Sequence, residues 1–228
     1  MRINASPFTV ARNCVRGVHV TYITVEQEAS DEFVEKKSRF IGYCCPVTTG
    51  EEAVAFIEAI KKKHWDATHN VPAYILREGG LMRFSDDGEP QGKAGIPVLD
   101  AMKKNNITDA AVVATRYFGG ILLGGGGLIR AYSHTASIAI AAAKKIIRRE
   151  CSIMMLNCDY HAYGRVNAVV PECGGIIDDT QFLDKVTLSF HISPTEIDKL
   201  QKKLMDATGG QTTAVEIEKQ FFTFPFEE

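Results

Sequence analysis

Apolar residues recur at helical spacing in some parts of the chain. In other parts they form a continuous run, which is typical of a buried strand. Between residues 51 and 64, Val54, Ile57 and Ile60 recur at helical spacing. Residues 109–118 are largely apolar, as expected for a strand covered on both faces of a sheet. The pattern therefore predicts a protein that mixes helices and strands.

In the first two thirds of the chain, strands and helices are predicted to alternate. β-branched and aromatic residues indicate strands at 18–29, 39–47, 71–77 and 109–118. Helical spacing indicates helices at 51–64, 98–106 and 128–147. Two loops, 85–97 and the glycine-rich 119–127, complete this part.

The last third of the chain has the clearer pattern. Strands are predicted at 151–161, 175–183, 185–193 and 211–224, and helices at 162–174 and 194–210. Pro194 opens the second helix and Gly209 closes it. This order, β-α-β-β-α-β, is that of a ferredoxin-like domain.

The length of 228 residues exceeds the roughly 100–150 of a common single domain, so two domains are expected. We predict a first domain at 18–147 and a second at 148–228, joined by a short linker around 148–150. Residues 1–17 are expected to be a disordered extension, although their arginines and lack of acids leave an organellar transit peptide open.

Composition and cysteine spacing indicate where in the cell the protein is expected. The most apolar stretch, 138–143, is far shorter than the ~20 residues of a membrane span, so no membrane contact is expected. The six cysteines form no C-x-x-C pair, which favours reduced thiols over a zinc or redox site. A cytoplasmic protein is therefore expected.

Charge is uneven along the chain. Residues 1–150 carry 20 Lys and Arg against 16 Asp and Glu, whereas residues 151–228 carry 6 against 12. The first part is therefore the better candidate for an anionic partner, although an exposed basic helix face would give the same excess.

The loop SDDGEPQGKAG, residues 85–95, combines glycines with charged side chains. Its glycines allow tight turns that present N–H groups outward, and Lys93 adds a positive charge. Such a loop suits an anion. Two alternatives stay open: a structural turn whose aspartates bond their own backbone, and a Mg²⁺ site built from Asp86, Asp87 and Glu89.

The segment GGILLGGGG, residues 119–127, holds six glycines in nine residues. Glycine packs no side chain and loses much chain entropy on folding, so close approach to this backbone is expected. The partner is either another part of the protein or a phosphate at the helix N-terminus, with Arg116 and Arg130 supplying charge. The candidate backbone contacts are those of Gly119, Gly120, Gly124, Gly126 and Gly127.

Common nucleotide and nucleophile motifs are absent. GEPQGKA has the wrong spacing for a P-loop, with Ala94 in place of the hydroxyl residue. Ile129 stands where a G-x-G-x-x-G motif needs its last glycine, and there is no G-x-S-x-G. No cofactor is expected.

Histidine and aromatic residues near these loops are supporting candidates. Histidine as a residue type suits acid–base chemistry near neutral pH, but neither His69 nor His134 has a recognisable catalytic partner, so a structural or RNA-contacting role is preferred for both. Tyr117 and Tyr132 would add stacking on bases if their rings are exposed.

These residues resemble a known family. SDDGEPQGKAGIPVL, followed by VVATRYFGGILLGGGGLIRAYS, is similar to the paired signature of the YigZ/IMPACT family, and EKKSRFIG and DATHNVPAYIL match its flanking segments. Lys93 stands where the family commonly has a small hydroxyl residue, and Gly125 where a bulkier one is frequent. The match runs from about Glu35 to Ala143, and the last third resembles the second domain of bacterial members.

The resemblance implies an α+β chain with two domains. The first would be similar to ribosomal protein S5 domain 2 and to domain IV of elongation factor G, and the second, ferredoxin-like, to its domain V. Eukaryotic relatives regulate translation by engaging a regulator of an initiation-factor kinase. No catalytic residues carry over.

We therefore expect a translation-associated binding protein that contacts structured RNA or the ribosome. Phosphate contacts are assigned to Lys93, Arg116 and Arg130, with Asp87 and Glu89 supporting the loop. One alternative is a metal-dependent hydrolase of peptides or nucleotides using His69 and the loop carboxylates. The other is a regulator that binds only proteins, a translation-regulatory protein among them, for which the acidic second domain offers a surface.

Overall fold

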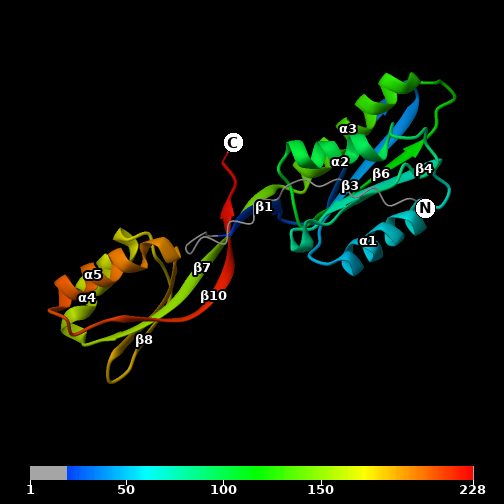
Figure 1. The fold of residues 1–228 in the computed structure, drawn as a ribbon. Coiled ribbons are helices and arrows are strands. Elements are labelled where there is room, and N and C mark those ends of the chain that lie inside the picture. Colours follow the sequence, from blue (N-terminus) through cyan, green and yellow to red (C-terminus); the bar gives the residue numbers. More distant parts are fainter. Residues whose placement is uncertain (1–19, 228) are drawn as a thin grey trace. The chain divides into compact units, whose positions relative to one another are not determined.

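A computed structural model of the chain describes residues 20–227, which divide into two compact units (Figure 1). The N unit comprises residues 21–148 and 223–227, and the C unit comprises residue 20 and residues 149–222. The predicted extension at 1–17 and Cys14 lie outside the described residues.

The N unit is built on a sheet with the strand order β2-β3-β6-β4-β5. Its strands are β2 (Ala29–Glu35), β3 (Ser38–Pro46), β6 (Ala110–Tyr117), β4 (His69–Ile75) and β5 (Met82–Phe84). Every neighbouring pair is antiparallel. β6 lies at the centre and is buried almost throughout, which confirms the strand predicted from its apolar run.

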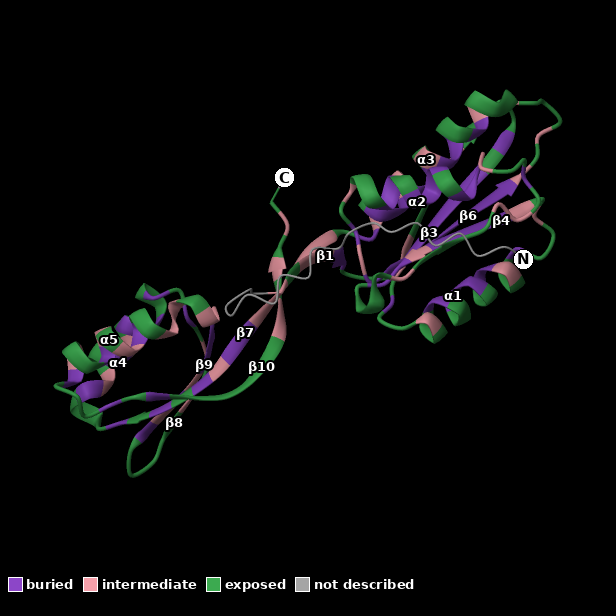
Figure 2. Cartoon of the chain, viewed as in Figure 1, coloured by how far each residue is buried: buried purple, intermediate pink, exposed green. Residues whose placement is uncertain are grey.

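Helices cover both faces of this sheet. Helix α1 (Gly50–Lys63) packs on the face of Ala111 and Val113, whereas α2 (Gly95–Lys104) and α3 (Gly124–Ala142) pack on the face of Val112 and Ala114 (Figure 1). The strands between them are buried along much of their length (Figure 2). Alternate residues of β6 therefore point into two separate cores.

The C unit has the predicted β-α-β-β-α-β order. Its elements are β7 (Lys145–Cys158), α4 (Tyr160–Glu172), β8 (Ile176–Phe182), β9 (Val186–Ile192), α5 (Ile197–Thr208) and β10 (Ala214–Pro225). The strand order β10-β7-β9-β8 is that of a ferredoxin-like sheet, and α4 contacts α5. Leu156, Leu188 and Phe190 of the sheet pack in one core with Val166 and Leu200 of the helices.

The structure departs from the predicted elements in four places. The strand predicted at 18–29 ends early, as β1 (Thr21–Val25), and is followed by the unpredicted β2. β5 was also not predicted. Helix α3 begins at Gly124 instead of residue 128, and 145–147 belong to β7 instead of a helix. The segment 148–150, expected as a linker, also lies within β7.

Tertiary pairing explains the missed strand β2. Its sequence, ASDEFVE, is acidic and mostly exposed, so its apolar pattern is weak. β2 nevertheless pairs with β3 along its whole length, from Ala29 opposite Cys44 to Glu35 opposite Ser38. Pairing with β3 therefore determines this strand, although its own sequence gives only a weak strand pattern.

Two further findings concern composition. Within the described residues, no helix is both long and apolar enough to cross a membrane. Five cysteines are free thiols: Cys44, Cys45, Cys151, Cys158 and Cys173. The fold class is confirmed as α+β, an α/β unit followed by a ferredoxin-like unit.

Candidate functional site

Four loop segments meet at one end of the N-unit sheet, around the glycine-rich segment. We call this surface the loop end and define it as residues 35–38, 61–69, 85–94 and 117–127. The Phe118 N–H donates to Thr68 Oγ1 at 3.0 Å, and the Gly119 N–H donates to Ser38 Oγ at 3.2 Å. A Cβ added to Gly119 would lie 2.0 Å from the Lys37 carbonyl carbon, so only glycine fits there.

A buried ion pair lies beneath the loop end. Arg116 follows Val112 and Ala114 on the same face of β6, and its Nη1 donates to Glu89 Oε1 at 2.5 Å. Only 5% of Arg116 and 8% of Glu89 are exposed. Tyr132 of α3 donates its hydroxyl to the same carboxylate oxygen at 2.8 Å. One carboxylate thus joins the 85–94 loop to the central strand and to α3.

This pair corrects two expectations from the sequence. Arg116 was expected at the surface as a phosphate ligand, but it is buried, and its Nη1 is bonded to Glu89. Tyr132 was considered for stacking on bases, but its ring is fully buried. Burial, and then the neighbouring Glu89, raise the pKa of Tyr132. Both residues hold the loop end together from inside.

The aspartates of the 85–94 loop also face inward. Asp86 accepts the N–H groups of Gly92, Ala94 and Gly95 at 2.8, 3.1 and 2.8 Å, and the last two lie at the N-cap and the first residue of α2. Asp87 Oδ2 accepts the Asn70 N–H at 2.6 Å. The structural-turn interpretation of these carboxylates therefore explains their positions.

His69 is held in one tautomer by the same loop. Its Nδ1 lies 2.7 Å from the Asp87 carbonyl oxygen, which only accepts, so Nδ1 carries a proton. Nε2 lies 3.7 Å from Glu89 Oε1. Among residues 20–227, no group of three or more His, Cys, Asp or Glu is arranged to hold a metal ion.

Helix α3 begins with a run of four glycines. Gly124, Gly125, Gly126 and Gly127 form its first turn, which has no acidic residue, and Leu123 at the N-cap supplies no side-chain hydrogen bond. The first N–H groups of a helix have no partner within the helix, and together they carry partial positive charge. Gly124 has a φ of +73°, a conformation that favours glycine. This turn therefore exposes an uncapped, positively polarised backbone.

A cavity of about 520 Å³ opens beside this turn. Gly124 and Gly125 line it together with Lys93, whose Cε would lie 3.8 Å from a Cβ at Gly125. Arg116 also lines the cavity, and its Nε is the single buried side-chain nitrogen or oxygen of residues 20–227 without a hydrogen-bond partner. The remaining lining residues include His69, Glu89, Phe118, Leu122, Leu123 and Leu128.

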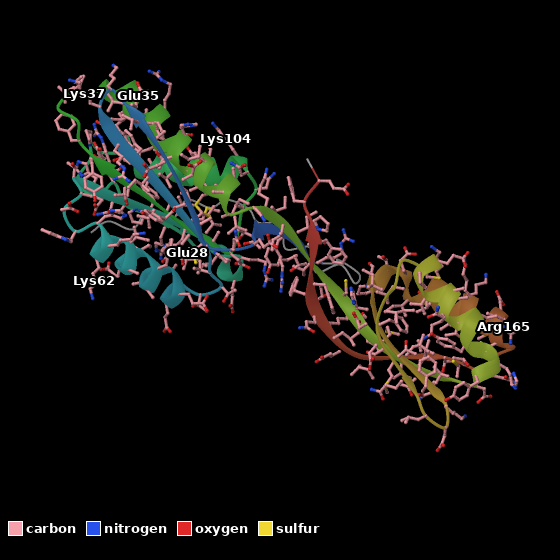
Figure 3. The ribbon with its side chains drawn as sticks, turned by 180° about the vertical axis from the view of Figure 1, so that it is seen from behind. Glu28, Glu35, Lys37, Lys62, Lys104 and Arg165 are labelled. Carbon is pink, nitrogen blue, oxygen red and sulfur yellow. The ribbon has the colours of Figure 1, made fainter. Side chains whose placement is uncertain are left out.

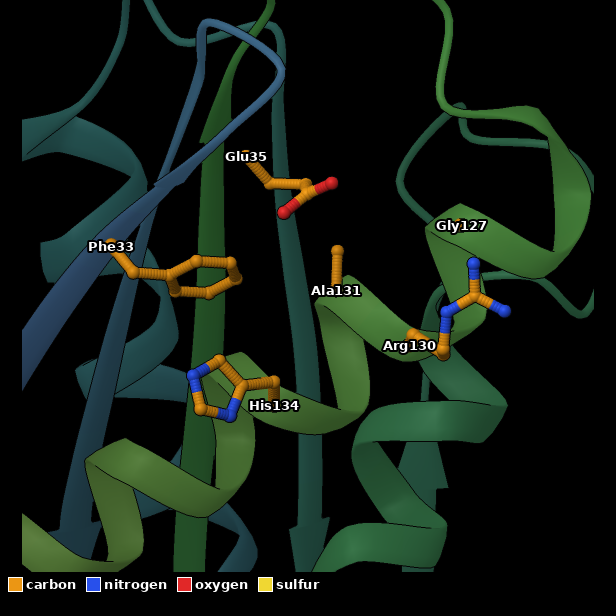
Figure 4. Close-up of a pocket in the computed structure, with 6 residues that line it drawn as sticks. All are labelled: Phe33, Glu35, Gly127, Arg130, Ala131 and His134. Atoms are coloured by element: carbon orange, nitrogen blue, oxygen red, sulfur yellow. The ribbon is translucent and has the colours of Figure 1, made fainter.

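Arg130 lies in a different place. It lines a separate pocket of about 210 Å³ with Phe33, Glu35 and His134, in which the side chains of Glu35 and Arg130 come from different elements (Figure 4). The His134 ring meets Phe33 edge to face at 4.7 Å. The structure thus joins Lys93 and Arg116 in one cavity but places Arg130 outside it, near Gly126 and Gly127.

A second polar network lies on the opposite face of the sheet and was not predicted. His64 Nε2 lies 2.7 Å from the Tyr43 hydroxyl, and His64 Nδ1 lies 2.9 Å from the Tyr117 hydroxyl. Tyr117 donates to Asp66 at 3.0 Å, so it accepts from Nδ1, and Tyr43 donates to Nε2. Helical spacing from Ile57 and Ile60 was the available signal that His64 faces the core.

Two protein families match the chain. The Impact N-terminal domain matches residues 36–140, and a domain of unknown function, DUF1949, matches residues 156–211. The first match contains the whole cavity and the buried pair. The second lies within the ferredoxin-like unit.

Similar proteins span most of the chain. The IMPACT family member YvyE of Bacillus subtilis is 36% identical over 193 residues, which cover 84% of this chain and 89% of YvyE. YigZ of Escherichia coli is 32% identical over 187 residues, covering 81% and 92%. Protein IMPACT of Mus musculus is 33% identical over 96 residues, covering 40% and 30%.

One solved structure agrees with the two-unit architecture. A crystal structure described as that of a hypothetical protein shares 29% identity and a TM-score of 0.55, and covers 87% of this chain and 98% of its own. The similarity therefore includes both units.

Breaking the buried pair should destabilise the N unit strongly. Glu89→Leu leaves the Arg116 charge buried without a partner, which costs about 3–5 kcal/mol of unfolding free energy. The double variant Glu89→Leu with Arg116→Met should recover much of this loss because no charge remains. Urea titration of the full chain, followed by circular dichroism, measures both. A loss below about 1 kcal/mol in the single variant would contradict the role of the pair.

Stability should depend on the protonation of His64. Burial, then the nearby Lys63 and Arg39, lower the pKa of His64 from its ordinary 6.5. The unfolded chain therefore binds this proton at higher pH than the folded chain does. The stabilisation is complete above pH 6.5 and is lost as the pH falls from there toward the lowered pKa.

Unfolding free energies measured between pH 7.5 and 5.5 test this dependence, because the interval spans ~6.5, the ordinary pKa of histidine. The wild type should lose more stability on acidification than His64→Gln does, because the variant has no group to protonate. Equal slopes for the two proteins would show that His64 does not contribute.

Proposed function

We propose that this chain, which belongs to the IMPACT family, acts in translation in the cytoplasm by binding structured RNA, free or within the ribosome, through its loop end. The family resemblance supports the link to translation. The observation that most directly supports RNA binding is the uncapped first turn of α3 beside Lys93, because free helix N–H groups and a lysine together suit a phosphate.

The charge of the loop end supports an anionic partner. Lys36, Lys37, Lys62 and Lys63 are exposed there, and Lys93 is partly exposed. Lys37 lies at the tip of the β2–β3 hairpin and Lys62 lies on α1 (Figure 3). Asp86 and Glu89 bond within the protein, and Asp87 lies 3.4 Å from Lys61. Among the exposed charges of the loop end, four lysines therefore face two acids, Glu35 and Asp66. Phosphate contacts dominate the affinity of nucleic-acid binding.

Exposed aromatic rings add a second kind of contact. The only tryptophan of the chain, Trp65, is 84% exposed, and Phe118 is 44% exposed. Both belong to the loop end. Rings that stack on bases contribute about 1–3 kcal/mol each, so an aromatic surface among lysines favours RNA over a purely acidic protein partner.

The β2–β3 hairpin carries its two lysines at a conformational cost. Glu35 pairs with Ser38, so Lys36 and Lys37 form a two-residue turn, and their φ angles are +45° and +65°. A turn with both φ values positive prefers Asn-Gly. Keeping lysine at both positions fits a surface that uses their charge.

Reversal of the Lys93 charge should weaken RNA binding. We expect Lys93→Glu to lower affinity about tenfold at low salt and to reduce the salt slope by about one, because one phosphate contact is lost. The matched control is Lys104→Glu, the same change at the exposed C-terminal end of α2. Binding to purified ribosomes and to a labelled structured RNA across a salt series measures both variants.

The outcome decides between macromolecular partners. Salt-sensitive binding that Lys93→Glu weakens and Lys104→Glu preserves supports RNA. No RNA binding at low salt, or equal binding by the two variants, overturns the proposal in favour of a protein partner, whose contact should respond less to salt.

The hairpin provides an independent test of the same surface. The double variant Lys36→Asn with Lys37→Gly should raise the unfolding free energy, because these residues adopt the turn with less strain, while RNA binding weakens. Thermal unfolding and RNA titration of the same protein measure the two effects. A variant that is stabilised and binds RNA as well as wild type would exclude the hairpin from the interface.

A further inference from the structure

We propose that the cavity beside α3 holds a single nucleoside monophosphate unit of the RNA, with its phosphate at the glycine turn and its base against Phe118. This inference deepens the proposed function and rests on it. The two proposals differ in what they require of the RNA. Binding to a basic surface needs only exposed phosphates, whereas occupation of the cavity needs one nucleotide displaced from its neighbours.

Three groups define the phosphate end. The first turn of α3 offers uncapped N–H groups at Gly124 and Gly125, and Lys93 lies beside them. Arg116 lines the same cavity, and its Nε has no partner although the side chain is almost fully buried. A buried donor without an acceptor costs free energy, so an anion that came within reach of Nε would be stabilised by it.

The rest of the cavity suits a base rather than a bare phosphate. Its walls are largely apolar and include Phe118, Leu122, Leu128 and Pro90. The Arg116 guanidinium lies 5.3 Å from the Phe118 ring centre, and 44% of Phe118 is still exposed, which leaves ring surface for stacking. Aromatic and apolar walls with a few polar groups are typical of small-ligand sites.

Size limits the occupant to a small unit. The volume of about 520 Å³ falls within the ~300–1,000 Å³ of small-molecule sites and excludes a double helix. Proteins that read RNA commonly take unpaired bases that are splayed out and stacked on aromatic rings. A bulged or terminal nucleotide of a structured RNA meets this requirement, as does a free nucleotide.

The test uses the full chain and three probes: adenosine 5′-monophosphate, adenosine and inorganic phosphate. Calorimetric titration should show saturable binding of the monophosphate that is tighter than that of either part alone. Two hairpin RNAs, identical except for one bulged adenosine, then distinguish a nucleotide within RNA from a free one, and the bulged hairpin should bind more tightly.

A matched pair of variants locates the site. Gly125→Asp puts a carboxylate into the cavity at a position where its Cβ makes only an ordinary contact, and an acid in the first helical turn favours folding. Monophosphate binding should fall about tenfold or more, because the carboxylate repels the phosphate and takes up its N–H donors. Gly50→Asp adds the same charge in the first turn of α1, outside the cavity and with open space around its Cβ, and should have a much smaller effect.

The outcomes separate this inference from the proposed function. Salt-sensitive RNA binding without saturable monophosphate binding overturns the cavity site and leaves the RNA surface standing. Monophosphate binding that is equally weakened by both variants, or by neither, places the nucleotide elsewhere and also overturns it. Loss of both RNA and monophosphate binding in the wild type would remove the proposed function itself.

Discussion

The buried ion pair between Arg116 and Glu89 is the interaction on which the loop end depends. β6 supplies the arginine, the 85–94 loop supplies the glutamate, and α3 adds the Tyr132 hydroxyl to the same oxygen. A charge buried this deeply is unfavourable without its partner. Displacement of the 85–94 loop would therefore leave Arg116 either exposed to water or buried without Glu89. The pair therefore fixes Lys93 and the start of α3 in one arrangement.

Two helices of the N unit begin near this pair, and their N-termini are treated in opposite ways. At α2, the Asp86 carboxylate accepts the N–H groups of Ala94 at the N-cap and Gly95 in the first turn, and a third from Gly92 in the loop. The N-terminus of α3 has no acid and no side-chain cap. The protein thus supplies its own anion at the start of α2, whereas no side chain caps α3, and this difference supports the proposal of a phosphate at α3.

The sequence predicted those elements whose pattern of apolar residues matches their burial in the structure. The apolar run of β6, the helical spacing of α1 and the β-α-β-β-α-β order were readable because burial follows the period of each element. Residues 124–127 were not readable as helix, because four glycines have low helix propensity and tertiary packing overrides it. The acidic β2 was missed for a similar reason, since β3 determines its pairing.

The candidate site was only partly predictable. Sequence singled out Lys93 and the two loops that line the cavity, but it could not tell that Arg116 points into the core, because this depends on the register of β6 against β3 and β4. It also could not separate Arg130 from the cavity. Charge and glycine content indicate an anion site, whereas the position of each side chain depends on contacts between segments far apart in the chain.

The most direct measurement is an amide NMR titration of the full-length protein with a structured RNA at low salt. The account predicts that the amide signals of the glycine turn, 124–127, shift together with those near Lys93, while amides at the C-terminal end of α2 stay in place. Shifts confined to the C unit, or a glycine turn that does not respond to bound RNA, would contradict it.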